Sequence, residues 1–113
     1  MKKVRVYGIK NCDTVKKALI HLANKKIEVD FYDYKKTLPT KESLNHWYDH
    51  LNDYPVNKKG TTYKKVGAAF EALKTHEQKI KFMIENSSMI IRPIIEDEKN
   101  GKILSVGKSF EEL

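Results

Sequence analysis

Hydrophobic and polar residues alternate near the start of the chain and then change to a helical spacing. Residues 3–7 alternate and stop at Gly8, which predicts a short strand that ends in a tight turn. Residues 13–25 have a helical pattern, with apolar side chains on one face at Val15, Ala18, Leu19, Leu22 and Ala23. Residues 27–32 alternate again and predict a second strand. Together these elements form a βαβ unit, in which we expect parallel strands and a right-handed crossover.

The middle of the chain, about residues 39–86, has helical patterns and is expected to form an all-helical insert. Thr40 is a good N-cap for a helix whose apolar face carries Leu44, Trp47, Tyr48 and Leu51. Residues 56–62 lack strong periodicity and predict a loop, and a helical region weakened by Gly67 follows. Residues 75–78 have the pattern of a capping box, so another helix should start there.

The last third of the chain returns to strand patterns. Residues 89–91 and 94–96 have strand-like patterns, and Asn100-Gly101 is a strong signal for a hairpin that leads into residues 102–106. Residues 109–112 have a second capping-box pattern, which predicts a short helix near the end. The chain of 113 residues therefore predicts one domain with the order βαβ, helical insert, ββα.

Composition and charge limit the classes of function. The chain has 22 basic and 15 acidic residues and a formal net charge of +7, but its lysines are spread along the whole length. Solvated surface lysines account for this pattern, and no aromatic-interleaved basic motif indicates direct nucleic-acid binding. Arg5 and Lys10 interrupt any apolar segment of an export signal, and no run of about 20 apolar residues could span a membrane. We expect a cytoplasmic monomer without membrane association.

Cys12 is the only cysteine and the strongest candidate for chemistry. It lies where the first strand leads into the first turn of the helix, and free N–H groups and the helix dipole favour a thiolate there. Lys10, Lys16 and Lys17 add positive charge, which Asp13 partly opposes. Cysteines at helix starts have pKa values of roughly 3.5–7.5 instead of about 8.5. The alternative is a buried, inert cysteine, which is common for free thiols.

Other constellations indicate less. His46 and His50 have the i, i+4 spacing of a metal-binding pair, but no further ligand motif accompanies them, so an exposed helix face is the better interpretation. We expect neither a metal site nor a bound cofactor. A single cysteine cannot form an internal disulfide, which is typical of a protein in a reducing compartment.

Three motifs occur in order along the chain: YGIKNCDTVKKA at residues 7–18, KGTTYKK at residues 59–65 and IRPI at residues 91–94. Together they resemble the arsenate reductase (ArsC)/Spx/YffB family over nearly the whole chain. The resemblance implies an α/β thioredoxin-like fold with a mixed sheet, βαβ and then ββα, and a helical insert between the halves.

The resemblance also implies roles for individual residues. Cys12 would be the nucleophile, and Arg92 would lie beside it and stabilise an anionic substrate or the thiolate. Pro93 would carry the cis peptide bond that lies opposite the cysteine in thioredoxin-like proteins. Cis bonds are essentially confined to X-Pro, and a proline between two apolar strand segments requires a special reason.

Three lysines are candidate substrate-binding residues besides Pro93: Lys10 near the cysteine, and Lys59 and Lys64 around the Gly-Thr-Thr motif. Relatives of the YffB type carry arginine around this motif. A lysine is a point charge and does not reproduce the planar, bidentate grip of arginine on an oxyanion. Spx regulators that switch through a disulfide use C-x-x-C, and this chain has Val15 in place of the second cysteine of that motif.

The sequence therefore predicts a thiol-dependent oxidoreductase. Its cysteine would attack an electrophilic sulfur or an oxyanion, and glutathione or another low-molecular-weight thiol would resolve the adduct as a co-substrate. One alternative is an arsenate reductase. The other is an Spx-like regulator that binds RNA polymerase without turnover, since one fold can host both roles.

Overall fold

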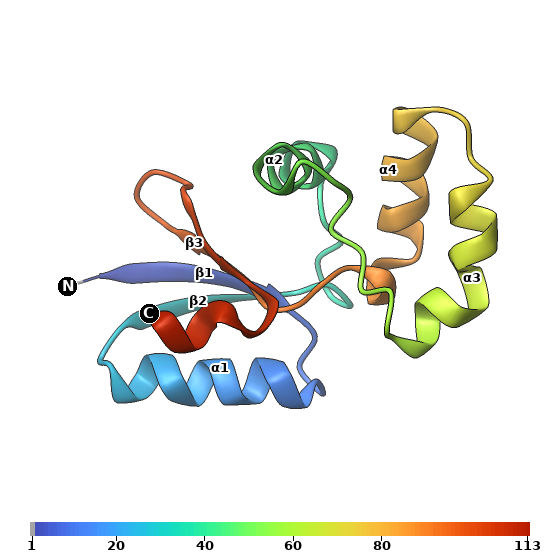
Figure 1. Cartoon of the computed structure of the whole chain (residues 1–113). Coiled ribbons are helices and arrows are strands. Elements are labelled where there is room, and N and C mark those ends of the chain that lie inside the picture. Colours follow the sequence, from blue (N-terminus) through green and yellow to red (C-terminus); the bar gives the residue numbers. More distant parts are fainter. Residues whose placement is uncertain (1) are drawn as a thin grey trace. The chain divides into compact units, whose positions relative to one another are not determined.

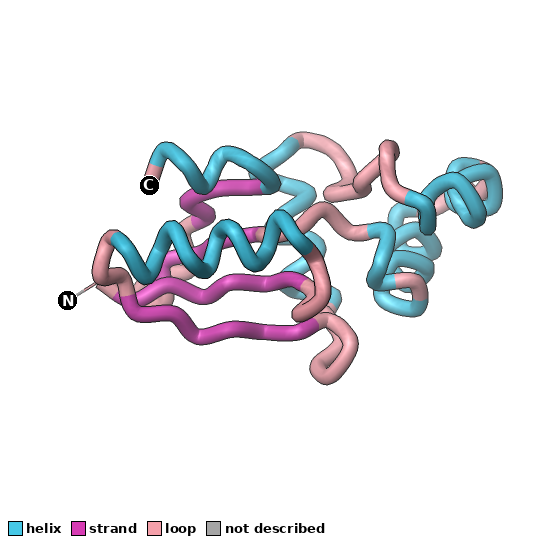
Figure 2. The backbone as a smooth tube through the Cα atoms, turned by 90° about the horizontal axis from the view of Figure 1, so that it is seen from below, coloured by secondary structure: helices cyan, strands magenta, loops and turns pink. Residues whose placement is uncertain are grey.

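The computed structural model describes residues 2–113, which fall into two compact units (Figures 1 and 2). The sheet unit combines the described residues up to Thr37 with Ile91–Leu113. The helical unit is Leu38–Ile90, and it contains the helical insert predicted at about residues 39–86. The two ends of the chain thus build one unit, and a single uninterrupted stretch builds the other.

The sheet unit has four strands, one α-helix and a 3₁₀-helix. They are β1 (Lys3–Gly8), α1 (Asp13–Asn24), β2 (Glu28–Asp33), β3 (Ile94–Asp97), β4 (Ile103–Val106) and the 3₁₀-helix η2 (Gly107–Glu112). The strand order is β2-β1-β3-β4, with β1 and β2 parallel and the other two pairs antiparallel. This confirms the thioredoxin-like mixed sheet, βαβ followed by ββα, that the sequence predicts.

The core of this unit lies between one face of the sheet and the helices α1 and η2 (Figure 1). Its buried residues come from β1, α1, β3 and η2, and they are Val4, Val6, Ala18, Leu22, Ile95 and Phe110. The predicted apolar face of α1 is confirmed at Val15, Ala18 and Leu22, whereas Ala23 is exposed. Alternation along β1 turns Arg5 and Tyr7 to the opposite face of the sheet.

The register of the strands brings the end of β1 and the start of β3 together at one end of the sheet. β1 and β2 run parallel, and Gly8 at the end of β1 is paired with Asp33 at the end of β2. The next residue, Tyr34, donates its backbone N–H to the Gly8 carbonyl at 2.8 Å. Tyr7 is paired with Ile94, so β3 starts at the edge where β1 ends. The segments after β1 and before β3 therefore meet at the same edge of the sheet.

The C-terminal elements confirm one prediction and correct two others. The predicted hairpin at Asn100-Gly101 joins β3 and β4, and Gly101 adopts the left-handed backbone conformation with φ of 74°. The last helix begins at Gly107 rather than at Ser109, because the Ser109 hydroxyl accepts a hydrogen bond from the Val106 N–H from within the first turn. Residues 89–91 are not a strand: Met89 ends a 3₁₀-helix, and Ile90 forms only an isolated bridge.

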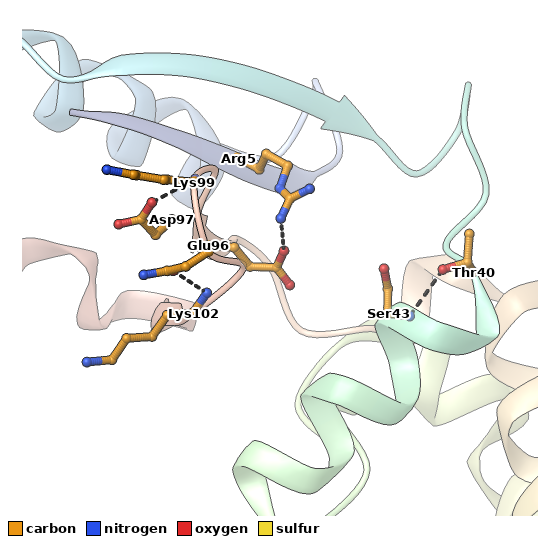
Figure 3. Close-up of polar contacts among 8 residues, drawn as sticks. Arg5, Thr40, Ser43, Glu96, Asp97, Lys99 and Lys102 are labelled. Atoms are coloured by element: carbon orange, nitrogen blue, oxygen red, sulfur yellow. Dashed lines mark hydrogen bonds and ion pairs between the residues drawn. The ribbon is translucent and has the colours of Figure 1, made fainter. Parts of the chain in front are cut away.

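The helical unit contains three α-helices and a short 3₁₀-helix. They are α2 (Lys41–Leu51), α3 (Thr61–Glu71), α4 (His76–Glu85) and η1 (Ser87–Met89). The N-cap at Thr40 is confirmed, since its hydroxyl accepts the Ser43 N–H at 3.1 Å (Figure 3). The capping box at Thr75 and Gln78 is confirmed as well. Side-chain and backbone bonds at the helix starts thus satisfy N–H groups that have no partner within the helix.

Two details of this unit differ from the pattern in the sequence. The predicted loop over residues 56–62 ends earlier, because α3 already begins at Thr61 after an N-cap at Gly60. Gly67 does not break α3, which continues to Glu71. The ring of Tyr63 packs against Gly67, and a Cβ atom on this residue would lie only 2.8 Å from the ring. Within residues 2–113, none of the helices has both the length and the apolar character that crossing a membrane requires.

Candidate active site

Cys12 lies at the N-cap of α1, one short loop after β1. Its backbone is extended, with φ of −100° and ψ of 125°, and its N–H donates to the Ile9 carbonyl at 3.2 Å. Gly8 allows the helix to start this close to the strand, because a Cβ atom there would lie 2.7 Å from Cγ2 of Val15. Cys12 is half-buried. The predicted position at the strand-to-helix junction is therefore confirmed.

The surroundings of Cys12 favour the thiolate. Burial is the largest influence and by itself raises the pKa of the thiol, but the Val15 N–H, the Arg92 guanidinium and the Thr14 N–H together lower the pKa below its ordinary value. The Val15 and Thr14 N–H groups belong to the first turn of α1 and stabilise the charged form of the sulfur, although Cys12 makes no regular side-chain capping bond. The helix start and one arginine thus supply the stabilisation that the sequence predicts.

Arg92 comes from the segment that precedes β3. Its guanidinium lowers the pKa of the Cys12 thiol, both as a hydrogen-bond donor to the charged form and as a positive charge. The peptide bond between Arg92 and Pro93 is cis, which confirms that implication of the family resemblance, and Pro93 is buried. Cys12, Arg92 and Pro93 all belong to the sheet unit. The cysteine and arginine of two distant motifs are therefore direct neighbours.

The lysines predicted to bind substrate lie in different units. Lys10 is exposed in the loop before Cys12 and lines an open groove of about 350 Å³ with Phe31 and Lys36. Lys59 and Lys64 are exposed in the helical unit, just before α3 and in its second turn. Their participation in substrate binding stays a prediction. Within residues 2–113, His, Cys, Asp and Glu side chains form no group of three that could hold a metal ion.

A pair of charged residues and a buried tyrosine in the sheet unit were not predicted. Arg5 of β1 pairs with Glu96 of β3, with 3.3 Å between Nη2 and Oε1 (Figure 3), and Glu96 is only 4% exposed. Tyr34 is 1% exposed, and its hydroxyl donates to the Ile91 carbonyl at 3.5 Å. Burial raises the pKa of Tyr34 well above its usual value, and Glu96 adds to this rise while Arg92 opposes it. The Tyr34 hydroxyl therefore lies within the field of both charged side chains.

The sequence offered little sign of this arrangement. Arg5 occupies a polar position of an alternating strand, which usually means solvent exposure, and Glu96 ends an apolar segment. Tyr34 directly follows a strand, where an aromatic residue has no distinctive meaning. The one available signal was that Tyr34 follows the second strand and the cysteine loop follows the first. Because the two strands are parallel, both segments lie at the same end of the sheet.

The arrangement can support one kind of chemistry. A stabilised thiolate is a nucleophile, and an arginine beside it can bind an anionic group of the molecule that is attacked. The chain has one cysteine, so no second thiol of the same chain can displace an adduct from Cys12.

Comparisons with known proteins show which family the chain resembles. The model of the ArsC family matches residues 7–113. A Haemophilus influenzae protein described as uncharacterized is 37% identical over 98 residues, which cover 81% of this chain and 82% of the relative. A solved structure named YFFB protein is 34% identical, with a TM-score of 0.75 and coverage of 91% of this chain and 90% of that chain.

A second solved structure shows the fold alone. The arsenate reductase from Vibrio cholerae is 23% identical and has a TM-score of 0.78, with coverage of 98% of this chain and 94% of that chain. The likeness extends over both units of the chain, from the strand before the cysteine to the final 3₁₀-helix.

Proposed function

The chain belongs to the ArsC family, and on that premise we propose that it is a thiol-dependent oxidoreductase with Cys12 as its single nucleophile. One observation carries the proposal: the Arg92 guanidinium and the first N–H groups of α1 lower the pKa of Cys12 despite its partial burial. A structural cysteine in an apolar environment would have a raised pKa instead. The solved relative named arsenate reductase supports the fold but not a choice of substrate.

In the first step, the Cys12 thiolate attacks one sulfur of a disulfide substrate. A bond forms between Sγ and that sulfur while the substrate S–S bond breaks, and the other half leaves as a thiolate that takes a proton from solvent. Arg92 has two roles here: it stabilises the attacking thiolate, and its planar donor group can hold an anionic part of the substrate.

In the second step, an external thiolate resolves the adduct. Glutathione or another low-molecular-weight thiol attacks the mixed disulfide, a new disulfide leaves, and the Cys12 thiolate is regenerated. The released disulfide still carries one half of the substrate, and exchange with a second external thiolate frees that half, so two external thiols together pass two electrons to one substrate disulfide. The expected cytoplasmic setting would supply such a thiol, and the single cysteine makes it a requirement.

The test compares wild-type protein with Cys12→Ser and Arg92→Lys. Each is supplied with hydroxyethyl disulfide and glutathione, and the oxidised glutathione formed is measured through glutathione reductase and NADPH. We expect turnover by the wild type, a reduced rate for Arg92→Lys and none for Cys12→Ser. A parallel assay supplies arsenate in place of the disulfide.

The outcomes separate the alternatives. Turnover with arsenate and none with the disulfide would support an arsenate reductase instead. If neither substrate turns over, and if RNA polymerase is retained equally by the wild type and by Cys12→Ser, an Spx-like binding role replaces the proposal. If Cys12 forms no adduct with oxidised glutathione in mass spectrometry, the proposal is wrong at its first step.

A further inference from the structure

Tyr34 connects the two segments that carry the reactive pair. Its backbone N–H donates to the carbonyl of Gly8, at the end of the strand that leads to Cys12, at 2.8 Å. Its hydroxyl donates to the carbonyl of Ile91, the residue before Arg92, at 3.5 Å. One residue therefore holds the cysteine segment through its backbone and the arginine segment through its side chain.

The side chain of Tyr34 has a fixed direction. It is 1% exposed, so its ring is enclosed on all sides and has little rotational freedom. The hydroxyl contacts Ile91 near the point where the Arg92 side chain leaves the backbone. A displacement of the Ile91 carbonyl would change the direction in which the guanidinium approaches Cys12.

The electrostatic surroundings keep this residue neutral. Burial raises the pKa of Tyr34 well above its usual value, and the Arg92 charge does not overcome that effect. A phenolate at this position would compete with the Cys12 thiolate for the guanidinium. A neutral phenol leaves the charge of Arg92 available to the sulfur.

We propose that Tyr34 is a positioning residue for Arg92, which fixes the Ile91 carbonyl and so directs the guanidinium at the Cys12 sulfur. The mechanism above does not use this buried phenol. The inference deepens the proposed function and rests on it in one respect, namely that Cys12 is the reactive group.

The test is Tyr34→Phe, which removes only the hydroxyl. The rate of Cys12 alkylation by iodoacetamide is measured as a function of pH for the wild type, Tyr34→Phe, Arg92→Ala and the double variant. We expect Tyr34→Phe to slow alkylation on the acidic side of the profile by about threefold to tenfold, because a less well placed guanidinium stabilises the thiolate less. In the Arg92→Ala background the same change should have no further effect, since the two residues would act through one interaction.

Tyr32→Phe is the matched control, because Tyr32 lies two residues earlier on β2 and packs edge-to-face on Tyr7 instead. It should leave the alkylation profile unchanged. Thermal unfolding reports whether each variant is folded, and 4-fluorophenylalanine at position 34 is a second replacement of similar shape without the donor. The proposal is overturned if Tyr34→Phe alkylates like the wild type, or if it has the same effect with and without Arg92. An ordinary thiol profile for the wild type would instead contradict the proposed function itself.

Discussion

The Arg92 guanidinium lowers the pKa of the Cys12 thiol, although the two residues are far apart in the sequence. The strand register explains their proximity. Cys12 follows β1 and Arg92 precedes β3, and these strands are antiparallel with Tyr7 paired to Ile94. The end of one strand therefore faces the start of the other, and the loops that continue from them share an edge of the sheet.

Removal of the guanidinium should make the thiol less acidic. We expect Arg92→Ala to raise the pKa of Cys12 and to slow its alkylation at acidic pH by about tenfold, because both a hydrogen bond and a positive charge are lost. Arg92→Lys should have a smaller effect, since it keeps the charge but not the planar donor geometry. Lys25→Ala, an exposed cation at the far end of α1, is the control for net charge and should alkylate like the wild type.

The pH dependence of stability follows from the direction of the same shift. The folded protein binds the Cys12 proton more weakly than the unfolded chain does, because the pKa is lowered on folding. The resulting stabilisation is fully present above the unfolded pKa of about 8.5 and is lost as pH falls through the folded pKa. Urea unfolding of the wild type and Cys12→Ser, under reducing conditions at several pH values, should give a stability difference that shifts in favour of the wild type as pH rises. A difference that stays constant with pH would contradict this prediction.

Gly8 should be intolerant of a side chain. A methyl group there meets Cγ2 of Val15 at 2.7 Å, so Gly8→Ala should force α1 away from the strand and cost about 1–3 kcal/mol of the free energy of unfolding. The cost should fall in a Val15→Ala background, where the clashing methyl groups are absent. Equal costs with and without Val15 would show that the close approach is not the cause.

The pair of Arg5 and Glu96 should be more costly to break than to replace. Arg5→Met leaves the Glu96 carboxylate, whose side chain is 5% exposed, without its cation and should cost about 2–4 kcal/mol. The double variant Arg5→Met/Glu96→Leu should recover most of that loss, since no charge is then left buried. Chemical denaturation of the single and double variants measures the two free energies. A double variant no more stable than Arg5→Met would mean that the buried carboxylate is not the source of the cost.

Features encoded by neighbouring residues were predictable from the sequence. The βαβ unit follows from a change of period along residues 3–32, and the caps at Thr40 and Thr75 follow from local hydrogen-bonding patterns. The hairpin follows from Asn100-Gly101, because glycine tolerates the positive φ that Gly101 adopts. The pairing of Cys12 with Arg92 needed the family resemblance, since no local pattern joins residues so far apart in sequence.

Features that depend on burial were not predictable. An arginine in an alternating strand usually faces water, yet Arg5 supports a carboxylate that is almost completely enclosed. Tyr34 had no assigned role, because only the folded chain brings its hydroxyl to the Ile91 carbonyl. The start of the last helix was misplaced for a related reason: Ser109 bonds to Val106 from within the helix, not from its first position.

The continuity of residues 38–90 has a consequence for how such proteins diversify. The stretch is closed by its own contacts, since Val56 bridges to Ile90 and the Asn57 N–H donates to the Met89 carbonyl at 2.8 Å. Exchange of this stretch between homologues interrupts no strand of the four-stranded sheet. It also leaves Cys12 and Arg92 in the chain segments to which they belong. Recombination over residues 38–90 therefore replaces the helices, with Lys59 and Lys64 among them, and leaves the sequence around Cys12 and Arg92 unchanged.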